Sequence, residues 1–302
     1  AAAKAQKVNN AFVNTAFGGF SWSGKATIAA TLVPPRRGPA PAYRDLSPTE
    51  PNVQETSGRS GAVQTFQDLL KSPNDERLFE FYATSQPALI DTSGKVRQIG
   101  TPAIYDEFSP SPDGKYFLIS RIERPFSYLF PFSRFPKKVE IWDSAGKAVF
   151  TLASIPLQDN IPVQGVPLGP RSYDWIPTEA ASLIWVEALD GGNPRNKAAH
   201  RDKMMRLSAP FSGSPAELLK IENRYQGRAF GEKDGLMIFY DFDRDSRHRR
   251  MFATDYRSPS SAKMISDLNV SDRYNDIGNP VTKQLPDGGS VIRQNGDHIF
   301  LS

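Results

Sequence analysis

The segment KYFLISRIERPFSYLFPFSRFPKKVEIWD, residues 115 to 143, contains two strand-like runs separated by a loop of aromatic residues and prolines. Residues 115–122 and 138–143 are rich in β-branched and aromatic side chains, which suit a pleated, half-buried surface. Arg124 and Arg134 lie among the aromatic residues of the loop between them. Because a rigid sheet positions the loops that it carries, such a loop indicates a binding role.

Runs of the same kind recur along the whole chain. They are ATIAATLV (26–33), QPALID (86–91), SLIWVEAL (182–189), LMIFYDF (236–242) and SVIR (290–293). Turn-forming pairs stand between the runs: Ser23-Gly24, Ser93-Gly94, Asp113-Gly114, Asp234-Gly235 and Asp287-Gly288. Glycine at such positions supplies the positive φ that tight hairpins require, so the sequence predicts many short antiparallel strands.

The turns recur at intervals near 50–60 residues, and an aromatic residue precedes several of them: Trp22, Phe108, Trp175 and Phe230. A repeat of this length with four short strands per unit is typical of β-propeller blades. The alternation of helices and strands that an α/β fold needs is absent. We therefore predict an all-β fold, a partial β-propeller of about four blades within residues 1–302. The final HIFLS ends inside a strand pattern, so we expect this chain to be part of a larger propeller.

Two segments interrupt the repeat. Residues 34–60 are rich in Pro, Gly, Ser and charge, and we expect a long loop, which in a compact domain is often functional. Residues 62–85 form the one clear helical pattern, and we expect a short helical insertion in two pieces broken at Pro73.

The amino-acid composition argues against several classes of binding partner. The net charge is +4, but 37 basic and 33 acidic residues are interspersed, and only residues 244–250 are locally basic, so we expect no nucleic-acid partner. No apolar run is long enough to span a membrane, and we expect no membrane partner. The chain has no cysteine, which excludes disulfides, zinc–thiolate sites and cysteine nucleophiles.

Metal and acid–base motifs are weak. Residues 241–250 contain D-x-D-x-D, but Ser246 and Phe252 replace the Gly and Glu of a calcium loop, so a polar hairpin tip is the better interpretation. His200, His248 and His298 have no partner at metal-ligand spacing. We expect no metal, no cofactor and no catalytic residue in this chain. Glu187 and Asp190 could face a channel, although turn and strand-end roles fit better. The four tryptophans are most simply explained by packing within and between blades.

Three stretches resemble one family: residues 46–91, residues 124–143 (RPFSYLFPFSRFPKKVEIWD) and residues 171–192 (RSYDWIPTEAASLIWVEALDGG). The TFQDLL, YATSQ, RFPKKVE and DGG pieces are the most specific. The chain resembles the N-terminal propeller of prolyl-oligopeptidase-family serine peptidases, specifically the chloroplast-type glutamyl endopeptidases and their bacterial relatives.

The resemblance implies a parent enzyme that cleaves peptide bonds after acidic residues. It also implies a C-terminal α/β-hydrolase domain with a Ser-Asp-His triad, which is absent here. The sequence holds no G-x-S-x-G, and the nearest string, Gly58-Arg59-Ser60-Gly61-Ala62, ends in Ala. The implied partners are a peptide or protein substrate and the hydrolase domain of the same parent. The compartment stays unknown: a bacterial relative favours the periplasm or secretion, and a plant relative favours the plastid.

Arg124 and Arg134 are the substrate-binding candidates, because a guanidinium binds a carboxylate through a planar fork that Lys cannot imitate. In the alternative interpretation they tie blade loops together. For the whole chain, the alternative is a stand-alone, non-catalytic propeller that binds a protein or peptide partner. In either case, open blade flanks would expose apolar faces, so we expect self-association.

Overall fold

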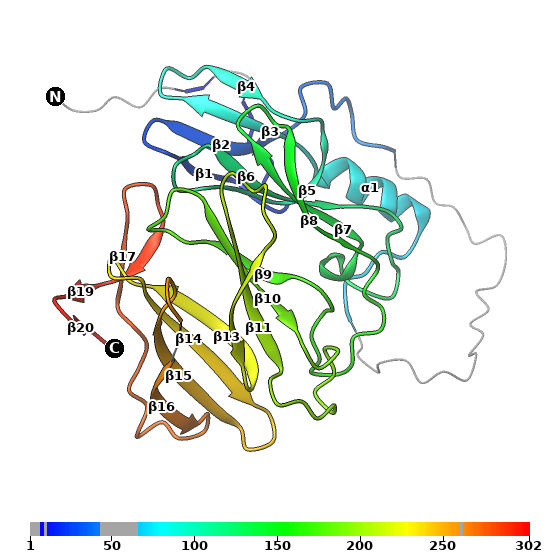
Figure 1. Cartoon of the computed structure of the whole chain (residues 1–302). Coiled ribbons are helices and arrows are strands. Elements are labelled where there is room, and N and C mark those ends of the chain that lie inside the picture. The colour runs from blue at the N-terminus through cyan, green and yellow to red at the C-terminus, as the bar shows by residue number, and fades with distance from the viewer. Residues whose placement is uncertain (1–6, 9–10, 43–65, 260–261) are drawn as a thin grey trace, which may run out of the picture.

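The computed structural model describes residues 7–8, 11–42, 66–259 and 262–302 (Figure 1). This part of the chain is nearly all β, with the helix α1 (Pro73–Ala83) and a 3-10 turn, η1 (Phe132–Arg134). Four antiparallel groups of four strands follow one another along the chain (Figure 1). Within each group, every strand pairs with the next strand in the sequence. The fold is a partial β-propeller, as the sequence predicts, and the four groups are its blades.

The first two blades share one sheet. Blade one contains β1 (Phe20–Ser23), β2 (Thr27–Leu32), β3 (Thr84–Asp91) and β4 (Val96–Gln98). Blade two contains β5 (Ala103–Pro110), β6 (Tyr116–Ile122), β7 (Lys137–Asp143) and β8 (Ala148–Ile155). The start of β3 also pairs with β5, Thr84 opposite Ile104 and Ser85 opposite Ala103, so backbone hydrogen bonds continue from one blade into the next.

The other two blades are separate sheets. Blade three contains β9 (Arg171–Trp175), β10 (Ser182–Ala188), β11 (Asp202–Ser208) and β12 (Ala216–Ile221). Blade four contains β13 (Arg224–Phe230), β14 (Leu236–Asp243), β15 (His248–Asp255) and β16 (Lys263–Asn269). Two small hairpins follow: β17 (Thr282–Gln284) with β18 (Ser290–Ile292), and β19 (Gln294–Asn295) with β20 (His298–Ile299).

All seven predicted strand runs are strands, namely β2, β3, β6, β7, β10, β14 and β18. The five predicted turn glycines have positive φ, between 66° and 87°: Gly24, Gly94, Gly114, Gly235 and Gly288. The polar segment after β14 is a hairpin tip, since β15 begins at His248 and pairs back along β14.

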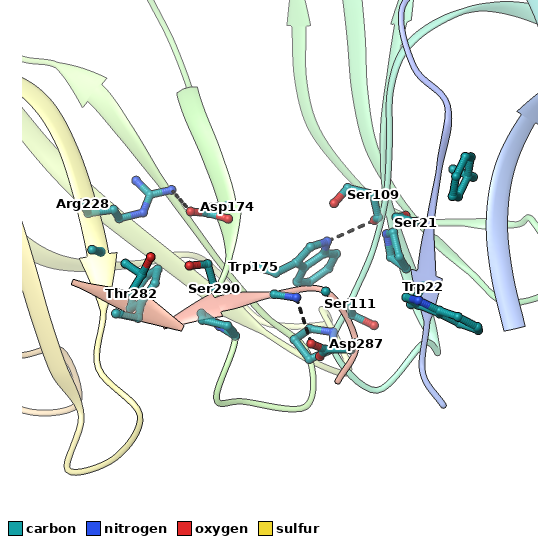
Figure 2. A pocket seen from close by; sticks show the side chains of 18 of the residues that line it. Ser21, Trp22, Ser109, Ser111, Asp174, Trp175, Arg228, Thr282, Asp287 and Ser290 are labelled. Carbon is teal, nitrogen blue, oxygen red and sulfur yellow. Dashed lines mark hydrogen bonds and ion pairs between the residues drawn. The ribbon is translucent and has the colours of Figure 1, made fainter. Parts of the chain in front are cut away.

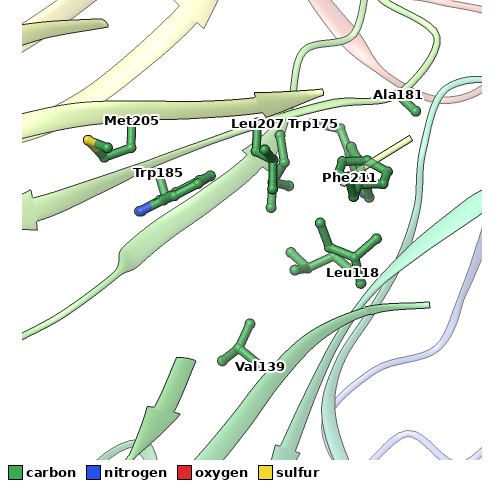
Figure 3. Packing of buried hydrophobic residues seen from close by; sticks show 10 residues of the cluster. Leu118, Val139, Trp175, Ala181, Trp185, Met205, Leu207 and Phe211 are labelled. Carbon is green, nitrogen blue, oxygen red and sulfur yellow. The ribbon is translucent and has the colours of Figure 1, made fainter. Parts of the chain in front are cut away.

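Apolar side chains fill the spaces between neighbouring blades. Figure 3 shows the cluster between blades two and three, where Leu118 and Val139 face Trp175, Leu207 and Phe211. A second cluster joins blades one and two, and a third joins blades three and four. Three of the four tryptophans, Trp142, Trp175 and Trp185, are buried in this way. Trp22 is 43% exposed, so the prediction that it packs within or between blades is wrong.

The helix is shorter than the sequence pattern indicates. Pro73 is its first residue, and the Ser72 side chain caps it by accepting a hydrogen bond from the backbone N–H of Asp75. Proline fits the first turn of a helix because no intrahelical partner is needed there, so Pro73 starts the helix instead of breaking it. Residues 66–72 are not helical, and residues 62–65 lie outside the described part. Of the long segment 34–60, residues 34–42 are irregular and the remainder lies outside the described residues.

The strand directions give the blades two faces. The turns after β1, β5 and β9 lie together: Gly114 packs against Ser23 and Gly24, and the backbone N–H of Asp113 donates to the Ala180 carbonyl. We call this side the turn face. The opposite side, the helix face, carries α1 and the loop 123–136 between β6 and β7, which contact each other through Phe79 and Phe126.

Candidate functional site

The first strand of every blade ends at one cavity on the turn face. The cavity measures about 720 Å³, and the carboxyl ends of β1, β5, β9 and β13, together with the β17–β18 hairpin, form its walls (Figure 2). Its volume is within the range of ligand pockets. In a propeller the innermost strands border the central channel, so a cavity at the ends of these strands lies at the mouth of that channel. The channel mouth is therefore the candidate site.

The walls of this cavity mix apolar surface with hydroxyl groups. Phe20 and Trp22 of β1 are 73% and 43% exposed, which is unusual for large apolar side chains within a strand. Hydroxyl groups come from Ser21, Ser109, Ser111, Thr282 and Ser290, and proline rings from Pro110, Pro112 and Pro177. Exposed aromatic surface beside hydrogen-bonding groups suits a peptide, which has both apolar side chains and a polar backbone.

An ion pair crosses the wall between β13 and β9. The Arg228 Nη2 and Asp174 Oδ2 atoms are 3.8 Å apart, and Figure 2 shows the two side chains pointing toward each other. The Arg228 side chain is only 3% exposed, and its guanidinium donates to the Ser172 carbonyl (2.8 Å) and the Tyr225 hydroxyl (3.0 Å). Desolvation raises the pKa of Asp174 above its ordinary value, and the Arg228 guanidinium offsets part of this shift. Arg228 is thus fixed, and Asp174 presents a carboxylate to the channel.

A second acidic group stands one blade away. Glu107 lies on β5 beside a smaller cavity of about 240 Å³ between β1 and β5. Its side chain reaches solvent, but nearby protein atoms displace part of the water around the carboxyl group. Partial desolvation, together with the carboxylates of Asp106 and Asp174, raises the pKa of Glu107 to about 7, although the Lys137 ammonium group opposes the shift. The channel wall therefore contains a group that can hold or release a proton near neutral pH.

Glu187 and Asp190 do not line this cavity. Asp190 has a fully buried side chain that pairs with Arg201 (2.9 Å) and Arg224. Arg224 also reaches the fully buried Asp202 (2.6 Å), which joins the ends of blades three and four. Glu187 pairs with Lys203 across β10 and β11 (3.1 Å). Both carboxylates therefore form salt bridges with neighbouring strands and loops, which fits the strand-end roles expected from the sequence.

Arg124 and Arg134, the two arginines predicted to bind substrate, lie on the helix face and not at the channel mouth. The Arg124 guanidinium pairs with Glu76 (2.6 Å) and Glu80 (3.1 Å) of α1 and lies over the Phe126 ring. The Arg134 guanidinium lies beside the Phe66 and Phe130 rings, which pack on each other, and donates to the Gln158 carbonyl (3.4 Å). Each arginine thus contacts an aromatic residue of its own loop, Phe126 for Arg124 and Phe130 for Arg134.

Among the described residues, no cluster of three or more His, Cys, Asp or Glu side chains is arranged to hold a metal ion. His248 pairs with Asp267 at 2.7 Å on the edge of blade four. In the same described ranges, no helix has the length and apolar character that crossing a membrane would require.

Sequence reasoning missed the channel residues. Asp174, Arg228 and Glu107 lie on β9, β13 and β5, whose sequences RSYDW, RYQGRAF and AIYDEFSP are too polar to read as buried strands. One signal was available. The aromatic residues noted before the turns, Trp22, Phe108, Trp175 and Phe230, all lie on the innermost strands.

Four blades, with their innermost strands converging on one channel mouth, define this protein as a propeller with a ligand-sized central opening. No family model matches the chain. Two curated plant proteins do. The probable chloroplastic glutamyl endopeptidase of Oryza sativa subsp. japonica is 35% identical over 286 residues, 93% of this chain and 30% of the relative. That of Arabidopsis thaliana is 33% identical over the same shares.

This chain is homologous to a region of the chloroplastic glutamyl endopeptidases, and the resemblance predicted from the sequence is confirmed. It spans about 30% of the length of these relatives. Solved structures of similar shape include the uncomplexed acylaminoacyl peptidase of Pyrococcus horikoshii (TM-score 0.40, 11% identity, 84% of this chain and 41% of the other). Another is a putative dipeptidyl aminopeptidase IV of Bacteroides ovatus (TM-score 0.42, 12% identity, 68% and 28%).

Proposed function

We propose that this chain is the propeller portion of a glutamyl-endopeptidase-like serine endopeptidase, in which it gates access and helps bind peptide substrate. The observation that carries the proposal is the convergence of four innermost strands on one cavity of about 720 Å³. The homology to chloroplastic glutamyl endopeptidases supports the reaction class. The nucleophile belongs to another domain of the parent, since the sequence has no G-x-S-x-G elbow.

The channel mouth has the groups that an extended peptide needs. Phe20 and Trp22 offer aromatic surface, and the hydroxyls opposite them offer hydrogen bonds to peptide groups. β1 pairs with β2 on one side only, and its other edge faces the channel. An extended segment can add to such an edge through main-chain hydrogen bonds. The propeller then contributes binding and filtering, while the acyl-enzyme chemistry takes place in the hydrolase domain.

The test uses the full-length parent enzyme and separates binding from chemistry. Replacing Phe20 and Trp22 together with Ala should lower kcat/KM for peptides of ten or more residues by about tenfold. Labelling by a small fluorophosphonate should keep its wild-type rate, because that probe needs only the nucleophile. Tyr274→Ala is the matched control, since Tyr274 is an aromatic residue that is 100% exposed and outside the cavity.

If the double variant cleaves long peptides as fast as wild type, the channel mouth has no role in substrate binding. If no chain that contains these residues reacts with the fluorophosphonate, the peptidase proposal fails. The stand-alone, non-catalytic propeller then becomes the better description.

We propose in addition that Arg124 or Arg134 receives the acidic side chain of the substrate. Arg124 already holds two carboxylates, Glu76 and Glu80, which demonstrates the geometry but means that a substrate would have to replace one of them. Replacing either arginine with Met should lower kcat/KM on Glu substrates by about 10- to 1000-fold, on the scale of a lost charge-assisted contact. Arg195→Met, at an exposed site on another blade, is the control. An unchanged kcat/KM in both arginine variants would remove the assignment.

A further inference from the structure

A second large cavity lies on the helix face, on the far side of blade one from the channel mouth. It measures about 870 Å³ and lies between residues 34–41, the helix α1 and the ends of β3 and β4. Arg36 and Arg37 come from the first of these walls and Arg77 from α1. No residue is shared with the cavity at the channel mouth.

None of the three arginines is paired with a carboxylate within the described ranges. Arg37 lies over the Phe81 ring, 4.2 Å from its centroid, and Arg77 donates to the neutral side chain of Asn74 (3.0 Å). About half of the other arginines in the described part form salt bridges with acids, for example Arg121, Arg206 and Arg250. Three neighbouring guanidinium groups thus have their carboxylate-binding capacity unused.

Among the described residues that line the cavity, the one acid is Glu80, and its carboxylate is bound to Arg124. It therefore does not neutralise the three arginines, and the cavity keeps an excess of positive charge. Like charges held close together repel one another, and an anionic ligand would relieve that repulsion.

Prolines form much of the remaining wall. Pro34, Pro35, Pro41 and Pro102 line the cavity, and the fixed φ of proline limits the motion of the backbone there. Stacking on Phe81 holds the Arg37 guanidinium in place. A site held in this way loses little conformational entropy when a ligand binds, which favours affinity.

We propose that this cavity, lined by Arg36, Arg37 and Arg77, binds a carboxylate-rich segment of a peptide or protein. Each guanidinium can take one carboxylate in a two-pronged contact, so a run of Asp or Glu residues matches the three groups better than a single anion does. The volume suits a short extended segment. This is a recognition site apart from the channel, and it does not depend on the peptidase proposal.

The test measures the binding of fluorescein-labelled hexaglutamate to the 302-residue chain by fluorescence anisotropy, with hexaglutamine as the uncharged probe. The chain should bind hexaglutamate at least tenfold more tightly than hexaglutamine, and the difference should shrink as salt is raised. The triple variant Arg36→Gln, Arg37→Gln, Arg77→Gln should lose at least tenfold in affinity. The control triple variant Arg195→Gln, Lys197→Gln, Arg273→Gln removes the same charge from exposed sites elsewhere and should bind as wild type does.

Near-ultraviolet circular dichroism of each variant establishes that it is folded. Equal weakening in the two triple variants would mean that only net charge attracts the peptide, and the proposal would be overturned. Absence of hexaglutamate binding to the wild-type chain would overturn it as well. Tighter binding of a hexapeptide of phosphoserines than of hexaglutamate would reject carboxylates as the ligand class. Because none of these measurements needs peptidase activity, their outcome is separate from that of the channel experiments.

Discussion

The indole nitrogen of Trp175 donates a hydrogen bond to the backbone carbonyl of Ser109 at 3.1 Å (Figure 2). Trp175 ends the innermost strand of blade three, and Ser109 lies near the end of the innermost strand of blade two. The bond therefore joins two blades at the wall of the channel. Trp175 also contributes its ring to the buried cluster between these blades, so it ties the packing between blades to the shape of the cavity (Figure 3).

Trp175→Phe should destabilise the chain by about 1–3 kcal/mol. The substitution removes the indole donor, leaves the Ser109 carbonyl without that partner and opens space in the cluster. Chemical denaturation measures the change. The same substitution at Trp22, which is 43% exposed, should change the free energy of unfolding by less than about 0.5 kcal/mol. Equal effects at the two sites would contradict the role given to the Ser109 contact.

Arg224→Met should destabilise the chain by about 1–3 kcal/mol, because the buried carboxylates of Asp190 and Asp202 lose their shared partner and keep one arginine each, Arg201 and Arg171. Arg195→Met, at an exposed site, serves as the control. Denaturant midpoints at pH 7 check the difference.

The same variant should change the response to acid. Burial by itself would raise the pKa of Asp190, but the guanidinium groups of Arg224 and Arg201 outweigh it and hold the pKa below its ordinary value. A carboxyl with a lowered pKa in the folded state adds stability at neutral pH, and this stability is lost as the pH falls through that pKa. Wild type should thus lose stability on acidification below about pH 4, whereas Arg224→Met should lose less. An identical pH dependence in the two proteins would contradict the ion-pair explanation.

Glu107→Gln should make the chain more stable at pH 8 and leave its stability at pH 5 nearly unchanged. The pKa of Glu107 is raised to about 7 in the folded state, so its ionisation costs free energy that the unfolded chain does not lose. This contribution makes stability fall as the pH rises from about 4.5 to 7. Because the side chain is open to solvent, the gain in Tm at pH 8 should be small, up to about 3 °C. A scan of Tm between pH 5 and 8 checks the crossover, and a gain of equal size at both ends would exclude the titration of Glu107 as its cause.

The 302-residue chain on its own should self-associate at tens of micromolar. Large apolar side chains are exposed on blade one (Phe20 and Trp22) and near the end of the described chain (Tyr274, Ile277 and Phe300). Exposed apolar surface of this kind promotes association. Multi-angle light scattering measures the mass directly, and a monomer across this concentration range would remove the prediction.

The sequence predicts the middle strands of the blades better than the innermost strands. Runs such as LMIFYDF are apolar because the middle strands are covered on both faces, and all seven of these runs became strands. β5, β9 and β13 border the channel, where side chains such as Glu107, Asp174 and Arg228 meet water or one another. Their polarity hides them from a search for apolar periodicity.

The candidate site was predicted less well for a related reason. Arg124 stands out in the sequence because of its aromatic neighbours, but its partners Glu76 and Glu80 are more than 40 residues away. The channel mouth collects residues from four blades, and no local pattern shows that Trp22 and Ser290 line one cavity. Only the packing of the blades side by side brings these residues to one cavity.

The pairing of β3 with β5 has a mechanical consequence. Main-chain hydrogen bonds join blades one and two, so we expect these two blades to move as one unit, the plate. Blade three contacts its neighbours mainly through packed side chains. Under an outward load, the plate should move as a single lever, and the seam beside Trp175 should part before the plate bends. The partial propeller is therefore expected to open first at the seam that borders the channel mouth.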